Sequence, residues 1–166
     1  MKILIVEDNE DSRNLLMKQL RVHGHEVTPT ANGVEALQQA LAQSPDIIIS
    51  DILMPKMDGY QLCQECKQND KLKDIPFIFY TATYLSGEDE KFGLSLGANS
   101  FIYKATEPDV LVQMLSEIVE KAKSGALAPP EVAPLEPSLF LYLIANSCPL
   151  LSILRYNPHP RQILSR

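Results

Sequence analysis

Five short apolar runs, each followed by a segment with helix-like spacing, dominate the first 120 or so residues of the chain. They span residues 3–6, 26–30, 46–50, 77–80 and 99–103, and their length and bounding turn residues predict β-strands. The first, third and fourth runs are almost continuously apolar, which is typical of parallel strands covered on both faces. The alternation therefore predicts an α/β fold: an open, doubly wound, five-stranded parallel sheet with right-handed crossovers and helices on both faces.

The segments between the runs carry apolar residues at the spacing of amphipathic helices. Leu16 and Leu20 lie four residues apart, as do Leu37 and Leu41. The clearest stripe is in the last helix, at Val110, Leu111, Met114, Leu115, Ile118 and Val119. Turn and capping residues agree with these helices: Gly24 after the first, Asn32-Gly33 before the second and Ser86 before the fourth.

The character of the chain changes near its C-terminus. We expect a domain over residues 1–121, a proline-rich linker over 122–138 and an apolar tail of unknown role over 139–166. The apolar stretch 139–154 is interrupted by Pro149 and is shorter than the roughly 20 residues of a membrane span. It is expected to pack on the domain or on a second chain, so homodimerisation is left open.

Composition narrows the function classes. The net charge of −6 argues against direct nucleic-acid binding by this chain. Only a short apolar run precedes Glu7, too short for a secretory signal, and three cysteines do not form a disulfide framework. These features predict a cytoplasmic protein without a membrane span. Cys63 and Cys66 form a C-x-x-C pair on a predicted helix, where they are expected to be packing thiols.

Polar and charged side chains follow four of the five predicted strands. Glu7 and Asp8 follow the first, Asp51 the third, Thr81 the fourth and Lys104 the fifth. Ligands of such sheets bind beyond the carboxyl ends of the strands, so these groups are expected to converge. Each one alone is explained as readily by a helix cap, a turn or a surface charge; together, in this order, they point to a site.

The residue types in this set favour phosphoryl chemistry. Three close carboxylates repel one another and call for a cation, and Mg²⁺ suits carboxylate and phosphate oxygens, with Mn²⁺ as an alternative. An aspartate oxygen can then act as a nucleophile toward phosphorus. A lysine offsets charge on the transferred group, and a threonine hydroxyl can donate a hydrogen bond to it.

Four segments closely resemble the response regulator receiver family of two-component systems. They are residues 3–9 (ILIVEDN), residues 46–59 (DIIISDILMPKMDG), the pair Thr81-Ala82 and residues 97–104 (GANSFIYK). The resemblance covers residues 1 to about 121 and implies the flavodoxin-like strand order 2-1-3-4-5.

Carried onto this sequence, the resemblance implies that Asp51 accepts the phosphoryl group. It implies a metal site at Glu7, Asp8, Asp51 and the Leu53 backbone carbonyl, and a phosphate contact at Lys104. Thr81 and Phe101 would be the switch residues, and the small Ala82 would leave room for the phosphoryl group. The implied function is a signalling switch, not an enzyme. A histidine kinase or phosphotransfer protein would phosphorylate it, and its helix 4, strand 5 and helix 5 face would signal to an unknown output.

Three positions depart from or modulate the family pattern. Ala105 stands at a position where the family commonly has proline, usually after a cis peptide bond. A cis bond before a residue other than proline costs about 3 kcal/mol. We therefore expect a trans bond here and a different direction of the Lys104 side chain. Leu53 and Thr83 are poor at positioning water, which predicts slow self-dephosphorylation.

Two alternatives remain open. An aspartyl phosphatase would have a similar pocket, but it normally carries an acid two residues after the nucleophile, where this chain has Leu53. A pseudo-receiver that acts only as a docking module is disfavoured by the intact set of Glu7, Asp8, Asp51, Thr81 and Lys104.

Overall fold

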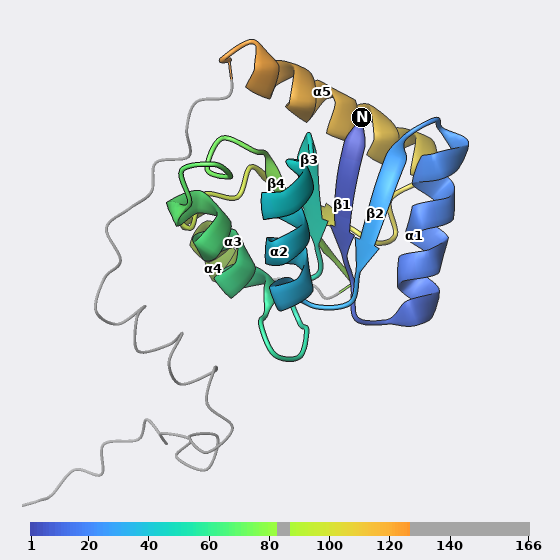
Figure 1. The fold of residues 1–166 in the computed structure, drawn as a ribbon. Coiled ribbons are helices and arrows are strands. Elements are labelled where there is room, and N and C mark those ends of the chain that lie inside the picture. The colour runs from blue at the N-terminus through green and yellow to red at the C-terminus, as the bar shows by residue number, and fades with distance from the viewer. Residues whose placement is uncertain (83–86, 127–166) are drawn as a thin grey trace, which may run out of the picture. The chain divides into compact units, whose positions relative to one another are not determined.

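The computed structural model describes residues 1–82 and 87–126. Several features predicted from the sequence lie outside the described residues: the Ser86 cap, Thr83, most of the linker and the whole apolar tail. Within them, five strands form one parallel sheet in the order β2-β1-β3-β4-β5, which confirms the predicted fold class and strand order (Figure 1). The strands are β1 (Lys2–Val6), β2 (Glu26–Thr30), β3 (Ile47–Ser50), β4 (Phe77–Thr81) and β5 (Ser100–Tyr103).

The predicted strands agree with the observed ones to within one residue at each end. All residues of β3 and β4 are buried, as continuous apolar runs between two helical layers should be. The register aligns the strand ends: Val6 lies opposite Ser50, and Ser50 lies opposite Phe79. The residues that follow β1 and β3 therefore emerge side by side at the carboxyl edge of the sheet.

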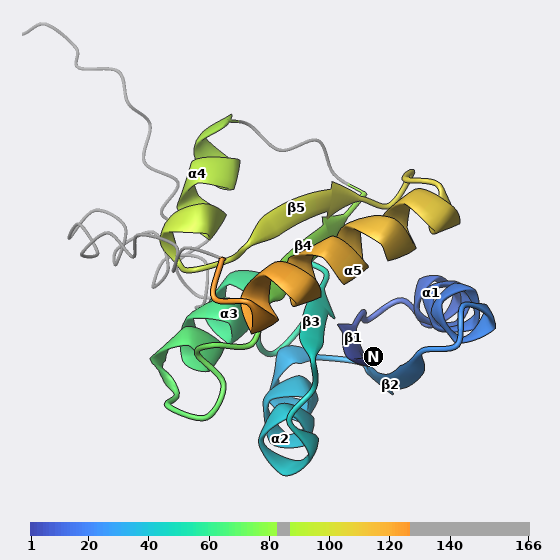
Figure 2. The ribbon, with the colours of Figure 1, turned by 90° about the horizontal axis from the view of Figure 1, so that it is seen from above.

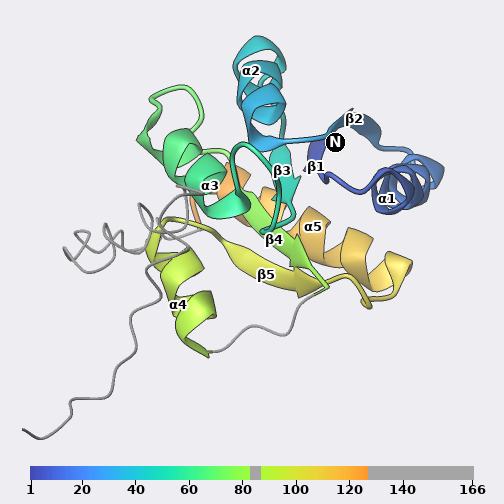
Figure 3. The ribbon, with the colours of Figure 1, turned by 90° about the horizontal axis from the view of Figure 1, so that it is seen from below.

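The five helices of the described residues cover the two faces of the sheet, and Figure 2 and Figure 3 show this arrangement from opposite sides. On one face, α1 (Glu10–Val22) and α5 (Pro108–Lys123) pack in a core that includes Leu16, Leu20 and Leu115. The other core contains residues of α2 and α3 and has Phe92 of α4 packed against it. These helices are α2 (Gly33–Gln43), α3 (Gly59–Gln68) and α4 (Gly87–Ser95). Among the described residues, no helix combines the length and apolar character needed to cross a membrane.

The buried face of α2 differs from what its leucine spacing suggested. Ala36 and Ala40 are fully buried, whereas Leu37 is only partly buried and Leu41 is 42% exposed. Small side chains face inward because α2 packs closely on its neighbours, and a Cβ on Gly33 would come within 2.7 Å of Met57 Cγ. The spacing of the leucines therefore predicted the helix but not which of its faces is buried.

Helix ends follow the capping chemistry of the sequence. The side chains of Asn9, Asn32 and Asp58 accept hydrogen bonds from backbone N–H groups in the first turns of α1, α2 and α3. Gly24 adopts a φ of +80° just after α1, a conformation that glycine tolerates better than other residues. The last helix extends to Lys123, two residues past the expected domain boundary at 121.

Cys63 and Cys66 are buried free thiols on α3, which confirms that they are packing residues. Burial raises the pKa of both thiols to about 12, so they remain protonated at neutral pH.

In a Cys148→Ser background, which removes the remaining thiol, we expect the native protein to resist labelling by maleimide. The urea-unfolded protein should incorporate two maleimide labels, one at Cys63 and one at Cys66. Rapid labelling of the folded protein, followed by mass spectrometry, would contradict this packing.

Candidate functional site

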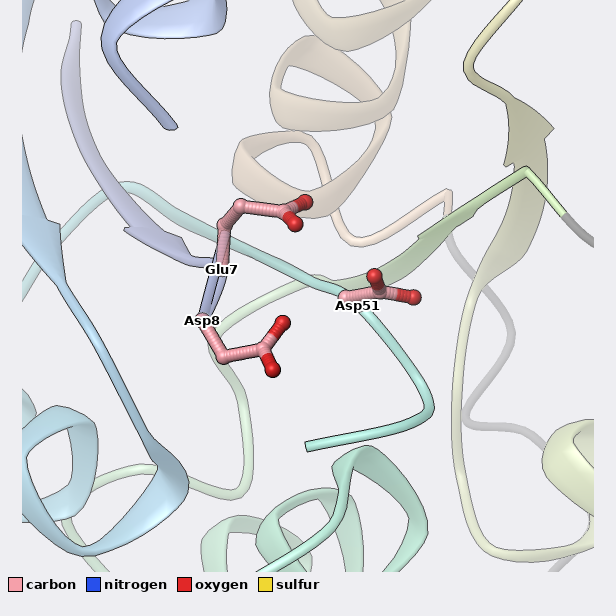
Figure 4. Close-up of side chains that lie close together, drawn as sticks. All are labelled: Glu7, Asp8 and Asp51. Atoms are coloured by element: carbon pink, nitrogen blue, oxygen red, sulfur yellow. The ribbon is translucent and has the colours of Figure 1, made fainter. Parts of the chain in front are cut away.

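Three carboxylates meet at the carboxyl edge of the sheet. Glu7 and Asp8 directly follow β1, and Asp51 directly follows β3. One carboxylate oxygen from each lies within 4.8 Å of the others, as Figure 4 shows for the three side chains. Glu7 is 3% exposed, whereas Asp8 is open to solvent and Asp51 is intermediate. The cluster is therefore buried in the protein at Glu7 and accessible to solvent at Asp8.

Lys104 Nζ lies between two of these carboxylates. It is 2.6 Å from Asp51 Oδ2 and 2.6 Å from Glu7 Oε2. The peptide bond between Lys104 and Ala105 is trans, as the absence of proline suggested. With this trans bond, the Lys104 side chain reaches into the acidic cluster.

Burial and charge act in opposite directions in this pocket. Burial raises the pKa of Glu7 and outweighs the hydrogen bond from Lys104, which lowers it. Burial also lowers the pKa of Lys104, but the hydrogen bonds to Asp51 and Glu7 outweigh it and raise that pKa overall. The lysine thus stays charged at neutral pH, while burial makes the Glu7 carboxylate costlier to ionise than in water, a cost that a further cation would offset.

The donor set fits a hard divalent ion. Carboxylate oxygens are the ligands that Mg²⁺ prefers, and two or three of them with water or phosphate oxygens make a usual site. One ammonium group leaves three nearby carboxylates incompletely compensated. Glu7, Asp8 and Asp51 are the residues of the described chain that can hold such an ion.

The backbone around Asp51 holds its side chain in place. Asp51 N–H donates to the Val6 carbonyl at 2.9 Å, and Asp51 Oδ1 accepts from Ile52 N–H at 2.6 Å. Gly59, the first residue of α3, packs directly on this segment and donates its N–H to the Ile52 carbonyl at 2.8 Å. A Cβ on Gly59 would collide with the Asp51 carbonyl oxygen. The start of α3 therefore fixes the loop that carries Asp51.

Gly59→Ala is expected to destabilise the fold by about 1–3 kcal/mol, because the new methyl group must displace the Asp51 backbone. Urea unfolding measures this effect. Gly87→Ala is the matched control, because no atom of the described residues outside its own helix and chain neighbours lies within 4 Å of a Cβ there; equal stability of the two variants would contradict the close packing.

The other predicted site residues have different surroundings. Thr81 ends β4 with 2% exposure, and its carbonyl accepts from Lys104 N–H at 2.9 Å. Phe101 on β5 stacks on Phe79 with ring centroids 4.8 Å apart, on the face covered by α3 and α4. Ala82 is exposed at the end of β4. The Leu53 side chain is 69% exposed and takes no part in the acidic cluster.

Two contributors to the site were not predicted from the sequence. Gly59 packs beneath Asp51, and Arg13 Nη1 donates to the carbonyls of Glu7 at 2.6 Å and Asp8 at 3.1 Å. The signal for Arg13 was its place one turn after the Asn9 cap, where its side chain can turn back to the end of β1. Gly59 ends the segment 46–59 that carries the family resemblance, but its place after the Asp58 cap does not by itself reveal the contact with Asp51.

Comparisons with known proteins agree with this architecture. A family model described as the response regulator receiver domain matches residues 3–116. Over 123 residues the chain is 36% identical to "Probable transcriptional regulator ycf27" of Pyropia yezoensis, covering 73% of this chain and 48% of that protein. The chain thus spans about half the length of the first curated relatives it matches.

Solved structures give the same result. The signal receiver domain of a signal transduction histidine kinase from Syntrophus aciditrophicus is 36% identical, with a TM-score of 0.67, covering 74% of this chain and 92% of that one. The receiver domain of sensor histidine kinase PA1611 from Pseudomonas aeruginosa, solved with magnesium coordinated in its active-site cleft, is 31% identical, with a TM-score of 0.66 and coverage of 72% and 97%. Because the family model spans most of the chain and these receiver domains share its fold, the chain belongs to the response regulator receiver family.

Proposed function

We propose that the chain is a phosphorylation-dependent signalling switch that accepts a phosphoryl group on Asp51. The observation that carries this proposal is the placement of Asp51 beside Glu7, Asp8 and the Lys104 ammonium at the accessible edge of the sheet. A histidine kinase or a phosphotransfer protein is the proposed donor. Receiver domains in general serve phosphorylation-dependent signalling, and the pocket has the groups needed for it.

In the proposed step, an Asp51 carboxylate oxygen forms a bond to phosphorus while the bond from phosphorus to the donor nitrogen breaks. The leaving nitrogen keeps the bonding electron pair. Glu7, Asp8, Asp51 and the Leu53 carbonyl are the proposed ligands of Mg²⁺, or of Mn²⁺ in its place. When bound, the ion would offset the crowded carboxylates and the charge on the phosphoryl oxygens.

Lys104 is proposed to shift its contact from Asp51 to a phosphoryl oxygen once the carboxylate has become an acyl phosphate. Its Nζ already lies 2.6 Å from the acceptor carboxylate, so a small side-chain movement suffices. The Thr81 hydroxyl would donate a hydrogen bond to another phosphoryl oxygen, and the small Ala82 would leave space for the group. These contacts exist only in the phosphorylated state, so they favour a conformation that accommodates them.

The output is proposed to run through the α4, β5 and α5 face. Phe101 stacks on Phe79, and a Cβ on Gly93 of α4 would collide with both rings. Movement of Thr81 toward the phosphoryl group would change the packing of Phe101 and hence the position of α4. We propose a cytoplasmic protein without direct nucleic-acid binding, with the boundaries 1–121, 122–138 and 139–166.

The test is labelling of the full chain by acetyl phosphate in the presence and absence of Mg²⁺. We expect one phosphoryl group per chain, seen as a gain in intact mass, only when Mg²⁺ is present. Labelling without the ion, or no labelling with it, would contradict the proposal. Continuous release of phosphate from simple phosphate esters, without stoichiometric labelling, would favour the phosphatase alternative.

The acyl phosphate is expected to decay slowly, over minutes or longer. Attack by water needs a group that orients it in line with phosphorus, and the exposed Leu53 side chain has no hydrogen-bonding atom. Leu53→Asn, which adds an amide there, should shorten the lifetime, and Leu53→Met should leave it unchanged. The loss of labelled mass with time measures it; a wild-type lifetime of seconds would refute the expectation.

A further inference from the structure

The peptide carbonyls of the acidic pair lie where β1 leaves the sheet. Val6 O still accepts from Asp51 N–H at 2.9 Å, and Glu7 N–H still donates to Thr30 O at 3.1 Å. The next two carbonyls, those of Glu7 and Asp8, instead accept hydrogen bonds from Arg13 Nη1, at 2.6 and 3.1 Å. One guanidinium nitrogen thus binds both carbonyls of the acidic pair.

This contact constrains the direction of both carboxylates. Backbone carbonyls near a buried residue need hydrogen-bond partners, and Glu7 is almost fully buried. The guanidinium fixes the orientation of the peptide group that joins Glu7 to Asp8, and the two side chains leave from either end of that group. Arg13 itself is anchored on α1, whose first turn is capped by Asn9 and whose inner face buries Leu16.

We infer that Arg13 is a positioning residue for the metal site: by binding the Glu7 and Asp8 carbonyls, it aims both carboxylates for divalent-cation binding without contacting the ion or the phosphoryl group. This inference rests on the proposed function, because it concerns the same pocket. The contacts of Arg13 are with peptide oxygens, whereas the Glu7 carboxylate is paired with Lys104.

A purely electrostatic role for Arg13 predicts the opposite result. A positive charge near the pocket repels Mg²⁺, so its removal should tighten cation binding. Loss of a positioning contact should weaken binding, and outer contacts that orient metal ligands typically change affinity 10–100-fold. Salt separates the two effects further, because ions screen a charge effect but not a geometric one.

The experiment measures Mg²⁺ affinity of the full chain by isothermal titration calorimetry, without any phosphodonor. We expect Arg13→Met to weaken Mg²⁺ binding about 10-fold or more, by the same factor at low and high salt. Arg21→Met is the matched control, because Arg21 Nη2 makes a similar contact, 3.0 Å to Val27 O, at the other end of α1. It should bind Mg²⁺ like the wild type.

Arg13→Lys covers the case in which Arg13→Met does not fold. It keeps the positive charge, so a charge effect predicts unchanged binding, whereas positioning by the guanidinium predicts weaker binding. Wild-type or tighter affinity in whichever variant folds overturns the inference and leaves the proposed function intact. Absence of Mg²⁺ binding by the wild type, measured in the same series, overturns both.

Discussion

Asp51→Asn will abolish phosphoryl labelling by acetyl phosphate. A neutral amide oxygen is a poor nucleophile toward phosphorus, and no other described carboxylate combines solvent access with a contact to the Lys104 ammonium. The fold should survive, because the asparagine oxygen can still accept from Ile52 N–H and Lys104 keeps its contact with Glu7. Intact-mass spectrometry after incubation with Mg²⁺ and acetyl phosphate is the measurement.

Asp58→Asn is the matched control for that variant. Asp58 lies in the same loop but caps α3, and asparagine caps helices as well as aspartate does. We expect this variant to be labelled like the wild type. If Asp51→Asn were still labelled, the phosphoryl acceptor would be another side chain, and this result would contradict the proposed switch.

Lys104→Met is expected to slow phosphorylation about 100-fold, which is the typical cost of removing one group that stabilises developing charge. The same change should tighten Mg²⁺ binding, since it removes a positive charge 2.6 Å from both Glu7 and Asp51. The two effects have opposite signs, so a general loss of structure cannot imitate them. Rates of labelling at saturating Mg²⁺ and a calorimetric titration measure them separately.

Lys123→Met serves as the control for loss of a lysine ion pair. Lys123 lies 3.3 Å from Asp46 on the surface, and exposed pairs of this kind contribute about 0–1 kcal/mol. Its labelling and Mg²⁺ affinity should match those of the wild type. Wild-type labelling by Lys104→Met, or weaker Mg²⁺ binding, would show that the lysine does not have the proposed role.

The fold was predictable because each strand is a short run of apolar residues with clear ends. Those runs placed all five strands, and the strand-end rule then located the pocket at the carboxyl edge. The α2 packing was not predictable from leucine spacing alone. Which face of a helix is buried depends on how closely its neighbours approach, and here Ala36 and Ala40 allow the close approach.

The arrangement inside the pocket depends on contacts that no local pattern encodes. The resemblance implied a phosphate contact for Lys104, and it did not indicate that the ammonium pairs with both Glu7 and Asp51. The packing of Gly59 on the Asp51 backbone and the reach of Arg13 to β1 join segments that only the folded chain brings together. Such contacts determine the geometry of the site, whereas the sequence reveals mainly which residues belong to it.

The most direct test of the central claim identifies the modified residue chemically. The full chain is phosphorylated with acetyl phosphate and Mg²⁺, reduced with borohydride, and digested for peptide mass spectrometry. Borohydride converts an aspartyl phosphate to homoserine, so we predict homoserine at position 51 and unchanged carboxylates at Glu7, Asp8 and Asp58. Homoserine at a different aspartate, or an unmodified Asp51 in protein that carries the phosphoryl mass, would contradict the claim.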